Sequence, residues 1–235
     1  MSEWAAKRFW TSTEVVAEGD GFSVRLDGRP VRTPAKKPLI VPTRVLAEEI
    51  AGEWQAQEKV VKPSTMPVTR TANSAIDKVA VQRTEIIEIL GEYGGTDLLC
   101  YRATGPQELI ARQAAAWDPL LDWAETALGA RLKVTQGVLP IAQNPPDLAR
   151  LSAQIVEYSD FELAAFHDLV ALPGSLVIGL AVTFGQKSPE ALWEIARLDE
   201  LWQIEQWGED EEAEATNRLK QQAFLDAARF FRLAQ

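Results

Sequence analysis

The chain has 235 residues, of which 46% are hydrophobic and 25% charged, a composition that excludes a collagen-like or largely disordered protein and can supply a buried core. Its 24 basic and 34 acidic residues give a net charge of -10, which repels phosphates and argues against a nucleic-acid partner. The single cysteine, Cys100, and the single histidine, His167, exclude an internal disulfide framework and every metal site that needs several such ligands.

Residues 7–42 are expected to form a small antiparallel β unit. Residues 22–26 alternate apolar and polar side chains, as a half-buried strand does. Asp27-Gly28 follows and is a strong hairpin signal, with residues 29–33 as the return strand. A further short apolar run at 39–41 predicts a third strand before Pro42.

After Pro42 the hydrophobic period becomes that of a helix. Thr43 is a suitable N-cap for a helix that extends to about Glu58. Leu46, Ile50 and Trp54 are spaced four apart and therefore share one face. We expect Trp54 to be structural because it continues this apolar stripe.

The rest of the chain is predicted to be almost entirely helical, with Ser188-Pro189 as a clear helix start. A short extended piece is expected at 132–134, and helices at 69–93, 106–128, 145–157, 160–171, 175–184, 188–207 and 210–233. Residues 1–70 have a net charge of +2 and residues 71–235 one of -12. We therefore predict an α+β protein with a β-rich N-terminal domain at 1–62 and a larger, acidic, helical domain at 63–235.

The N-terminal residues have neither the apolar segment of a secretory signal nor the Arg- and Ser-rich composition of a transit peptide, so a cytoplasmic protein is expected. Between Asp168 and Lys187 lie 18 uncharged residues, the length at which a membrane span becomes possible. Pro173-Gly174 interrupts this stretch, and residues 175–184 would span only about 15 Å as a helix. We expect a buried core helix and no membrane insertion.

Motifs for catalysis are absent: the sequence lacks a phosphate-binding glycine loop, a G-x-S-x-G elbow and an H-E-x-x-H pair. Cys100 and His167 could form a thiolate–imidazole pair. However, Cys100 lies in the apolar run 97–101, which is typical of a buried thiol, and His167 follows Phe166 in a helical pattern. We predict no catalytic residue and no cofactor.

The acidic run from Asp199 to Glu214 contains no Lys or Arg. Like charges one helical turn apart repel by a few tenths of a kcal/mol, but Gly208 suggests a break that places the later carboxylates in a favourable first turn. The run is either a solvated face or a docking surface for a basic partner; it lacks the spacing of an EF-hand, and no metal site is predicted. Its eight carboxylates are Asp199, Glu200, Glu205, Glu209, Asp210, Glu211, Glu212 and Glu214.

Large aromatic residues border these carboxylates. The chain has eight tryptophans, and two of them, Trp202 and Trp207, lie inside the acidic run. A buried tryptophan usually belongs to the core, but tryptophan beside charge is also typical of interface anchors.

Four stretches together resemble the assembly chaperones of the F-type ATP synthase that bind its alpha subunit, the family whose mitochondrial members are called ATP synthase assembly factor 2. They occur here as Lys7-Arg-Phe-Trp10 with Leu26-Asp-Gly-Arg-Pro-Val-Arg-Thr-Pro34, Glu53-Trp-Gln-Ala-Gln57 with Met66-Pro67, Thr96-Asp-Leu-Leu-Cys-Tyr-Arg102 with Trp117-Asp-Pro119, and 203–208 with Glu211. The stretches extend over nearly the whole chain in the family's order.

The resemblance implies a small N-terminal α/β domain followed by an orthogonal helical bundle, and a chaperone rather than an enzyme. Such a protein would be a monomer when free. It would hold the free alpha subunit, shield the surface that later meets the beta subunit, and be displaced during assembly. The family's important glutamate falls on Glu211, and its sensitive tryptophan on Trp54. The expected partner-binding residues are Gln203, Trp207, Asp210 and Glu211.

Two alternatives from other classes stay open at this point. An enzyme could act on a small basic substrate through the 199–214 carboxylates, which would require a closed pocket and a carboxylate of strongly raised pKa. A peripheral membrane protein could use residues 169–186, although a net charge of -10 opposes binding to anionic lipid.

Overall fold

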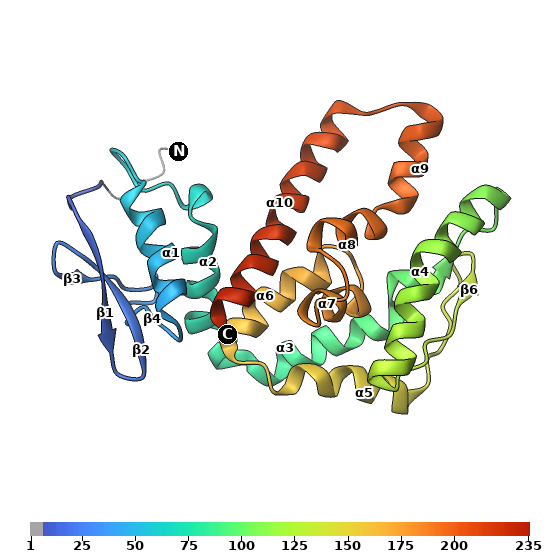
Figure 1. Ribbon diagram of the computed structural model, residues 1–235, viewed down its shortest axis with the longest axis horizontal. Coiled ribbons are helices and arrows are strands. Elements are labelled where there is room, and N and C mark those ends of the chain that lie inside the picture. Colours follow the sequence, from blue (N-terminus) through green and yellow to red (C-terminus); the bar gives the residue numbers. More distant parts are fainter. Residues whose placement is uncertain (1–6) are drawn as a thin grey trace. The chain divides into compact units, whose positions relative to one another are not determined.

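The computed structural model describes residues 7–235, which divide into two compact units. Unit 1 comprises Met1–Arg83, Tyr158–Ala165 and Arg229–Gln235, and unit 2 comprises Thr84–Glu157 and Phe166–Ala228. The predicted α+β class is confirmed, since a small β region is followed by helices (Figure 1). The division into a β-rich domain at 1–62 and a helical domain at 63–235 stays a prediction.

Unit 1 contains an antiparallel sheet with β2 (Gly21–Leu26) at its centre, paired with β1 (Thr13–Glu18), β3 (Arg29–Pro30) and β4 (Ile40–Val41). Asp27 and Gly28 have φ angles of 45° and 78°, and these positive values at both central residues match the hairpin turn predicted there. The Asp27 carboxylate accepts hydrogen bonds from the backbone N–H groups of Thr11 and Ser12. These bonds lower the pKa of Asp27. The return strand is shorter than predicted because the chain enters a hydrogen-bonded turn at Thr33.

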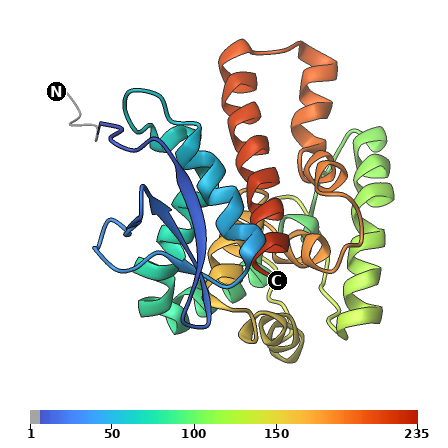
Figure 2. The ribbon, with the colours of Figure 1, turned by 60° about the vertical axis from the view of Figure 1, so that its left-hand side comes forward.

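The helix α1 (Arg44–Gln55) packs on β1 and β2 of this sheet (Figure 2). Its N-cap is Thr43, as predicted: the Oγ1 atom accepts a hydrogen bond from the backbone N–H of Leu46 at 3.2 Å. Leu46 and Ile50 are fully buried. The helix ends three residues before the predicted Glu58.

The single helix predicted at 69–93 is divided in the structure. It consists of α2 (Pro67–Ser74), the π-helical segment η2 (Ala75–Val79) and α3 (Ala80–Glu92). Gln82 has non-helical angles inside α3. The sequence gives no local signal for the π-helical segment, since residues 75–79 contain neither glycine nor proline.

The helices of unit 2 begin and end close to their predicted bounds, with one exception. The helix predicted at 188–207 divides at Arg197, where φ is -99° and ψ is 15°. No strand forms at 132–134, where an extended piece was predicted. The strand β6 (Thr135–Gln136) follows directly and pairs in parallel with β5 (Tyr101–Arg102). The helices after α3 are α4 (Gln107–Leu128), α5 (Pro145–Val156), α6 (Asp160–Ala171), α7 (Leu176–Thr183), α8 (Pro189–Ala196), α9 (Leu198–Trp207) and α10 (Glu211–Ala234). Residues of both units occur in α3, α6 and α10.

The apolar stretch 169–186 is part of the core, as expected, because Leu176 to Ile178 and Leu180 are fully buried in α7. Among the described residues, no helix has both the length and the apolar character needed to cross a membrane.

The N-terminus of α7 is held by a buried carboxylate, that of Asp97. Its Oδ1 atom accepts hydrogen bonds from Ser175 Oγ at 2.7 Å and from the backbone N–H of Leu99 at 3.1 Å. Its Oδ2 atom accepts one from the backbone N–H of Val177 at 3.0 Å. Burial raises the pKa of Asp97 to about 6, although these hydrogen bonds favour the charged form.

The raised pKa of Asp97 predicts a pH-dependent contribution to stability. The folded chain holds a proton on Asp97 below about pH 6, whereas the unfolded chain releases it above about pH 4. The contribution of Asp97 is therefore fully present below pH 4 and is lost as the pH rises through 6, a change of roughly 3 kcal/mol. The measurement is the free energy of unfolding of the wild type minus that of Asp97→Asn, from pH 4 to 7. A difference that is constant or grows with pH would contradict this account.

Candidate partner-binding surface

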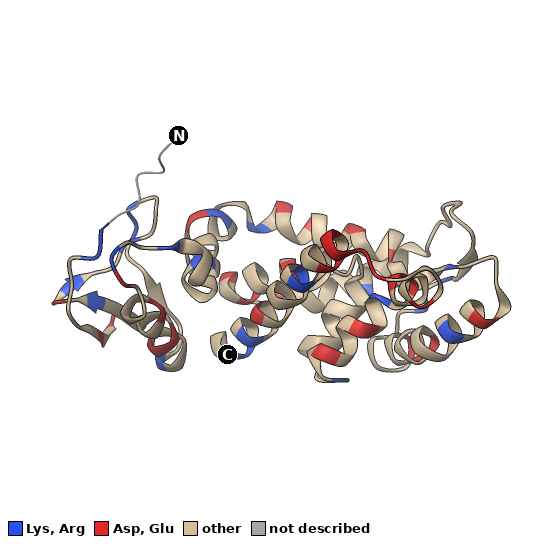
Figure 3. Ribbon diagram, turned by 90° about the horizontal axis from the view of Figure 1, so that it is seen from above, with Lys and Arg blue, Asp and Glu red and all other residues tan. Residues whose placement is uncertain are grey.

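The acidic run extends over α9, the turn after it and the first turn of α10, as Figure 3 shows in red. The break predicted at Gly208 is present, where φ is 88°. Asp210 caps α10, because its Oδ1 atom accepts hydrogen bonds from the backbone N–H groups of Glu212 and Ala213 at 2.9 and 3.0 Å. Glu211, Glu212 and Glu214 occupy the first helical turn, where the helix dipole favours negative charge.

Five of the eight carboxylates have polar partners inside unit 2. Asp210 accepts the capping hydrogen bonds of α10, and Glu205 forms a salt bridge with Arg112 at 2.7 Å. The other three pairs are Asp199 with Gln113 at 2.7 Å, Glu200 with Arg197 at 3.6 Å and Glu214 with Arg218 at 3.3 Å.

The remaining three carboxylates, those of Glu209, Glu211 and Glu212, have no hydrogen-bond or ion-pair partner within residues 7–235. All three are exposed. Their charges are therefore available to a partner at little cost in internal contacts.

The two tryptophans of the run differ in their surroundings. Trp202 is 7% exposed, and the guanidinium of Arg112 lies 4.7 Å from the centre of its ring. Trp207, the last residue of α9, is 79% exposed. An indole presented to solvent beside unpaired charge has the chemistry of an interface anchor, whereas Trp202 belongs to the packing of α9 on α4.

A groove of about 280 Å³ runs between α9 and the start of α10, and Gln203, Trp207 and Asp210 are among the residues that line it. A second groove of about 480 Å³ shares Arg197, Glu200 and Asp210 with the first and also reaches Glu212. The structure thus brings three of the four predicted partner-binding residues together, and Glu211 lies outside both linings. We call Gln203, Trp207, Glu209, Asp210, Glu211 and Glu212 the α9–α10 surface.

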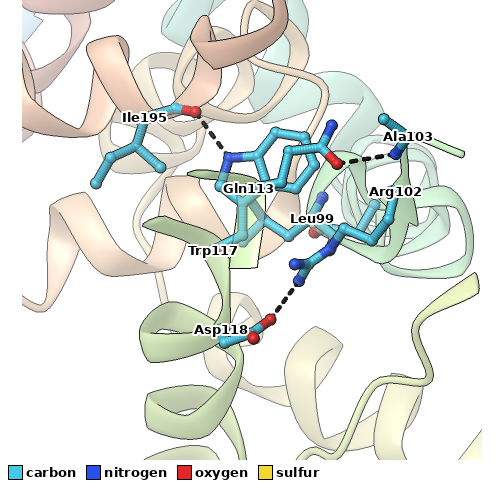
Figure 4. A network of polar contacts seen from close by, with 8 residues as sticks. Leu99, Arg102, Ala103, Gln113, Trp117, Asp118 and Ile195 are labelled. Atoms are coloured by element: carbon cyan, nitrogen blue, oxygen red, sulfur yellow. Dashed lines mark hydrogen bonds and ion pairs between the residues drawn. The ribbon is translucent and has the colours of Figure 1, made fainter. Parts of the chain in front are cut away.

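Side chains of α4 make polar contacts with α8, α9 and the segment at Ala103, and Figure 4 shows those with α8 and Ala103. Gln113 of α4 accepts a hydrogen bond from the backbone N–H of Ala103 at 2.8 Å and donates one to Asp199 at 2.7 Å. Trp117 Nε1 donates to the backbone oxygen of Ile195 at 2.9 Å. Sequence reasoning missed Gln113, because a single amide in an apolar helix gives no sign of its distant partners.

Arg102, in the stretch 96–102 that carries part of the family resemblance, contacts Trp117 of the same network. Its guanidinium lies 5.2 Å from the centre of the Trp117 ring and forms a 2.7 Å salt bridge with Asp118. Its Nε atom donates to the backbone oxygen of Leu99 at 3.0 Å. Arg102 therefore joins the stretches 96–102 and 117–119 to each other within unit 2.

Trp54 lies at the end of α1, partly buried, with its ring edge-on to that of Trp10 at 5.2 Å. Its neighbour Glu53 binds the start of α2: the two carboxylate oxygens accept from the backbone N–H groups of Val68 and Thr69, both at 2.7 Å. The Glu53–Gln57 stretch thus organises the connector after α1, a role that sequence reasoning did not identify. The structural role of Trp54 itself stays a prediction.

The proposed pairing of Cys100 with His167 finds no support. Cys100 is fully buried, and desolvation raises the pKa of its thiol to about 12, so it is protonated at neutral pH. His167 Nδ1 lies 3.0 Å from Asp168 Oδ1 on the same helix, which raises the pKa of His167. Within residues 7–235, no three His, Cys, Asp or Glu side chains are grouped so that they could hold a metal ion.

Comparisons with known proteins agree over most of the chain. A family model described as ATP12 chaperone protein matches residues 7–125. The crystal structure of Atp12 from Paracoccus denitrificans is 50% identical, with a TM-score of 0.96, and the match covers 99% of this chain and 100% of that one. A chaperone-like structure from Agrobacterium tumefaciens is 41% identical, with a TM-score of 0.92, over 97% of this chain and 86% of that one.

A more distant relative is the mitochondrial protein atp12 of Schizosaccharomyces pombe, which is 26% identical over 220 residues, or 88% of this chain and 75% of the relative. The resemblance to ATP synthase assembly chaperones is confirmed by these matches. The chain belongs to the ATP12 chaperone family.

Proposed function

We propose that this chain binds the free alpha subunit of the F-type ATP synthase, shields its subunit-interface surface and releases it to the beta subunit. Membership of a chaperone family supports the general activity. We choose the α9–α10 surface as the binding site because Trp207 is 79% exposed at the end of α9 and lies beside three carboxylates without partners in the described chain.

The two parts of this surface would act differently. An unassembled subunit exposes apolar interface area and tends to aggregate. Trp207 can cover part of such an area and exclude water from it. Glu209, Glu211 and Glu212 would fix the orientation of a basic partner surface and speed its association. Release needs no nucleotide if the beta subunit competes for the same area by mass action.

We propose binding rather than catalysis for the acidic run. The grooves beside it are open to solvent, and Glu200 and Glu214 in their linings are paired with arginines. Asp97, whose pKa is raised, lies outside the run. We further propose that the chain acts as a monomer in the cytoplasm, where a bacterial alpha subunit is made.

An aggregation assay tests this function. Alpha subunit diluted from denaturant should scatter light as it aggregates, and an equimolar amount of this chain should suppress the scattering. The beta subunit, diluted in the same way, should not be protected. Equal protection of both subunits, or of neither, would contradict the proposal.

We expect Glu211→Ala to weaken binding of the alpha subunit about tenfold, because a charge-assisted contact contributes roughly 1.5 kcal/mol. The Glu211 side chain has no partner within the described chain, so the melting temperature should fall only slightly, through the lost interaction with the helix dipole. Glu190→Ala is a matched control: Glu190 is likewise an exposed carboxylate in a first helical turn, that of α8. Titration calorimetry measures both. Equal affinities of the two variants for the alpha subunit would show that Glu211 does not contact it.

A further inference from the structure

Unit 1 has a charge opposite to that of unit 2. It contains 15 Lys or Arg and 12 Asp or Glu, a net charge of +3, whereas unit 2 contains 9 and 22, a net charge of -13. In unit 1, Lys and Arg recur on the strands and loops of the sheet (Figure 3). Four of them, Arg29, Arg32, Lys36 and Lys37, are exposed on β3 and the turn that follows it, and we call these four the basic turn.

Hydrogen bonds hold the basic turn in one conformation. Asp77 of η2 accepts from Thr33 Oγ1 at 2.8 Å and from the backbone N–H of Ala35 at 3.0 Å. Within the turn, the backbone N–H of Thr33 donates to the oxygen of Lys37 at 2.9 Å, and that of Lys36 to the oxygen of Thr33 at 2.8 Å. A cationic surface fixed in this way loses little conformational entropy when it binds.

Lys36 adopts a backbone conformation that lysine disfavours, with a φ angle of 68°. A glycine or asparagine would fit this left-handed conformation with less strain. Residues held in such a conformation are concentrated at binding and catalytic sites, where the surrounding structure maintains the strain. The hydrogen bonds that Asp77 accepts from Thr33 Oγ1, and that Thr33 Oγ1 accepts from the backbone N–H of Lys37, provide that support here.

The cations of the basic turn have no carboxylate within ion-pair distance in the described chain, whereas Arg25, Arg83 and Arg229 of the same unit each have one. Arg32 and Lys37 instead donate to the backbone oxygens of Lys36 and Ile76, at 2.9 and 3.0 Å.

An aromatic ring extends this surface. The guanidinium of Arg29 lies 5.7 Å from the centre of the Phe9 ring. Phe9 is 61% exposed and packs edge-on against Trp10. The basic turn therefore combines unpaired positive charge with an accessible apolar ring.

We propose that the basic turn binds an acidic segment of the alpha subunit, an inference that rests on the proposed function and adds a second contact to it. A short acidic polypeptide segment is small enough to contact the four cations and the aromatic ring of this surface at the same time. Nucleic acids and anionic membranes are extended polyanions, which a chain of net charge -10 repels. Contacts of opposite charge on the two units would specify the orientation of the partner.

The test compares two double charge reversals within unit 1. Lys36→Glu/Lys37→Glu should slow association with the alpha subunit about tenfold at low salt, because the steering charge is reversed. Lys59→Glu/Lys62→Glu changes the net charge equally at exposed positions outside the basic turn, and its association rate should stay within twofold of the wild type. The difference between the variants should disappear near 1 M salt, where charges are screened over about 3 Å.

The outcomes separate this inference from the proposed function. If the wild type binds the alpha subunit and Lys36→Glu/Lys37→Glu associates as fast as the control variant, the inference is overturned and the proposed function stands. If the wild type does not bind the alpha subunit at all, both are overturned. If the double variant does not fold, Lys36→Asn is used in its place. This substitution removes one positive charge and introduces asparagine, which tolerates a positive φ.

A second measurement identifies the class of ligand. A fluorescein-labelled octaglutamate peptide should bind the wild type at low salt, and Lys36→Glu/Lys37→Glu should lose most of that binding. Vesicles with 30% phosphatidylserine and a single-stranded oligothymidylate should not bind. Suppose instead that the wild type binds the vesicles or the oligothymidylate but not the peptide, and that the double variant loses this binding. That result would overturn the choice of an acidic polypeptide as the ligand.

Discussion

Asp97→Ala is expected to destabilise unit 2 by about 3 kcal/mol. The change removes the acceptor for Ser175 Oγ and for the backbone N–H groups of Leu99 and Val177, all of them buried. Each buried donor left without a partner costs about 1–3 kcal/mol, which is offset in part because a carboxylate no longer has to be buried. The melting temperature should fall by roughly 6–12 °C.

The position of Asp97 at the start of α7 makes this effect specific. Two of the three donors, Ser175 Oγ and the backbone N–H of Val177, lie at the N-terminus of α7, whose residues Leu176 to Ala181 are buried. Water cannot replace the carboxylate at this buried position. Asp122→Ala, on an exposed position of α4, is the matched control and should shift the melting temperature by less than about 2 °C. Equal shifts for the two variants would show that the buried carboxylate does not stabilise α7.

Trp54→Arg is expected to destabilise the protein by about 3 kcal/mol through unit 1. The change removes the edge-on contact between the Trp54 and Trp10 rings and the apolar area of a partly buried indole. It also places a second cation beside Arg8, whose guanidinium lies 5.5 Å from the Trp10 ring and donates to the backbone oxygen of Gln55. Thermal unfolding followed by circular dichroism measures the effect.

The control for this prediction is Trp54→Phe. Trp54 Nε1 is buried and has no hydrogen-bond partner within the described chain, so the phenyl ring loses no hydrogen bond. It keeps a ring against Trp10, and its cost should be about 1 kcal/mol. An unchanged melting temperature in Trp54→Arg would contradict a structural role for Trp54.

Features of the fold that depend on neighbouring residues were predictable from the sequence. The Asp27-Gly28 turn needs positive φ at two adjacent positions, which that dipeptide favours, and Thr43 and Ser188 cap helices through their own side chains. The interruptions at η2 and Arg197 were missed, because each depends on packing rather than on a local signal.

The candidate site was predictable only as a region. The acidic run and its tryptophans were visible in the sequence. The sequence did not show which of the carboxylates have partners elsewhere in the chain. Glu205 is bound by Arg112, which lies 93 positions earlier, and Asp199 by Gln113, 86 positions earlier. Only the fold shows that Glu209, Glu211 and Glu212 have no partner in the described chain, and this supports the expectation for Glu211 without testing it.

Co-expression with the ATP synthase alpha subunit, followed by gel filtration of the soluble fraction, tests the central claim most directly. Alpha subunit expressed alone should aggregate. With this chain present, the two should elute together as a one-to-one complex. If the alpha subunit stays insoluble or elutes separately while this chain is folded, the proposed binding of the alpha subunit is wrong.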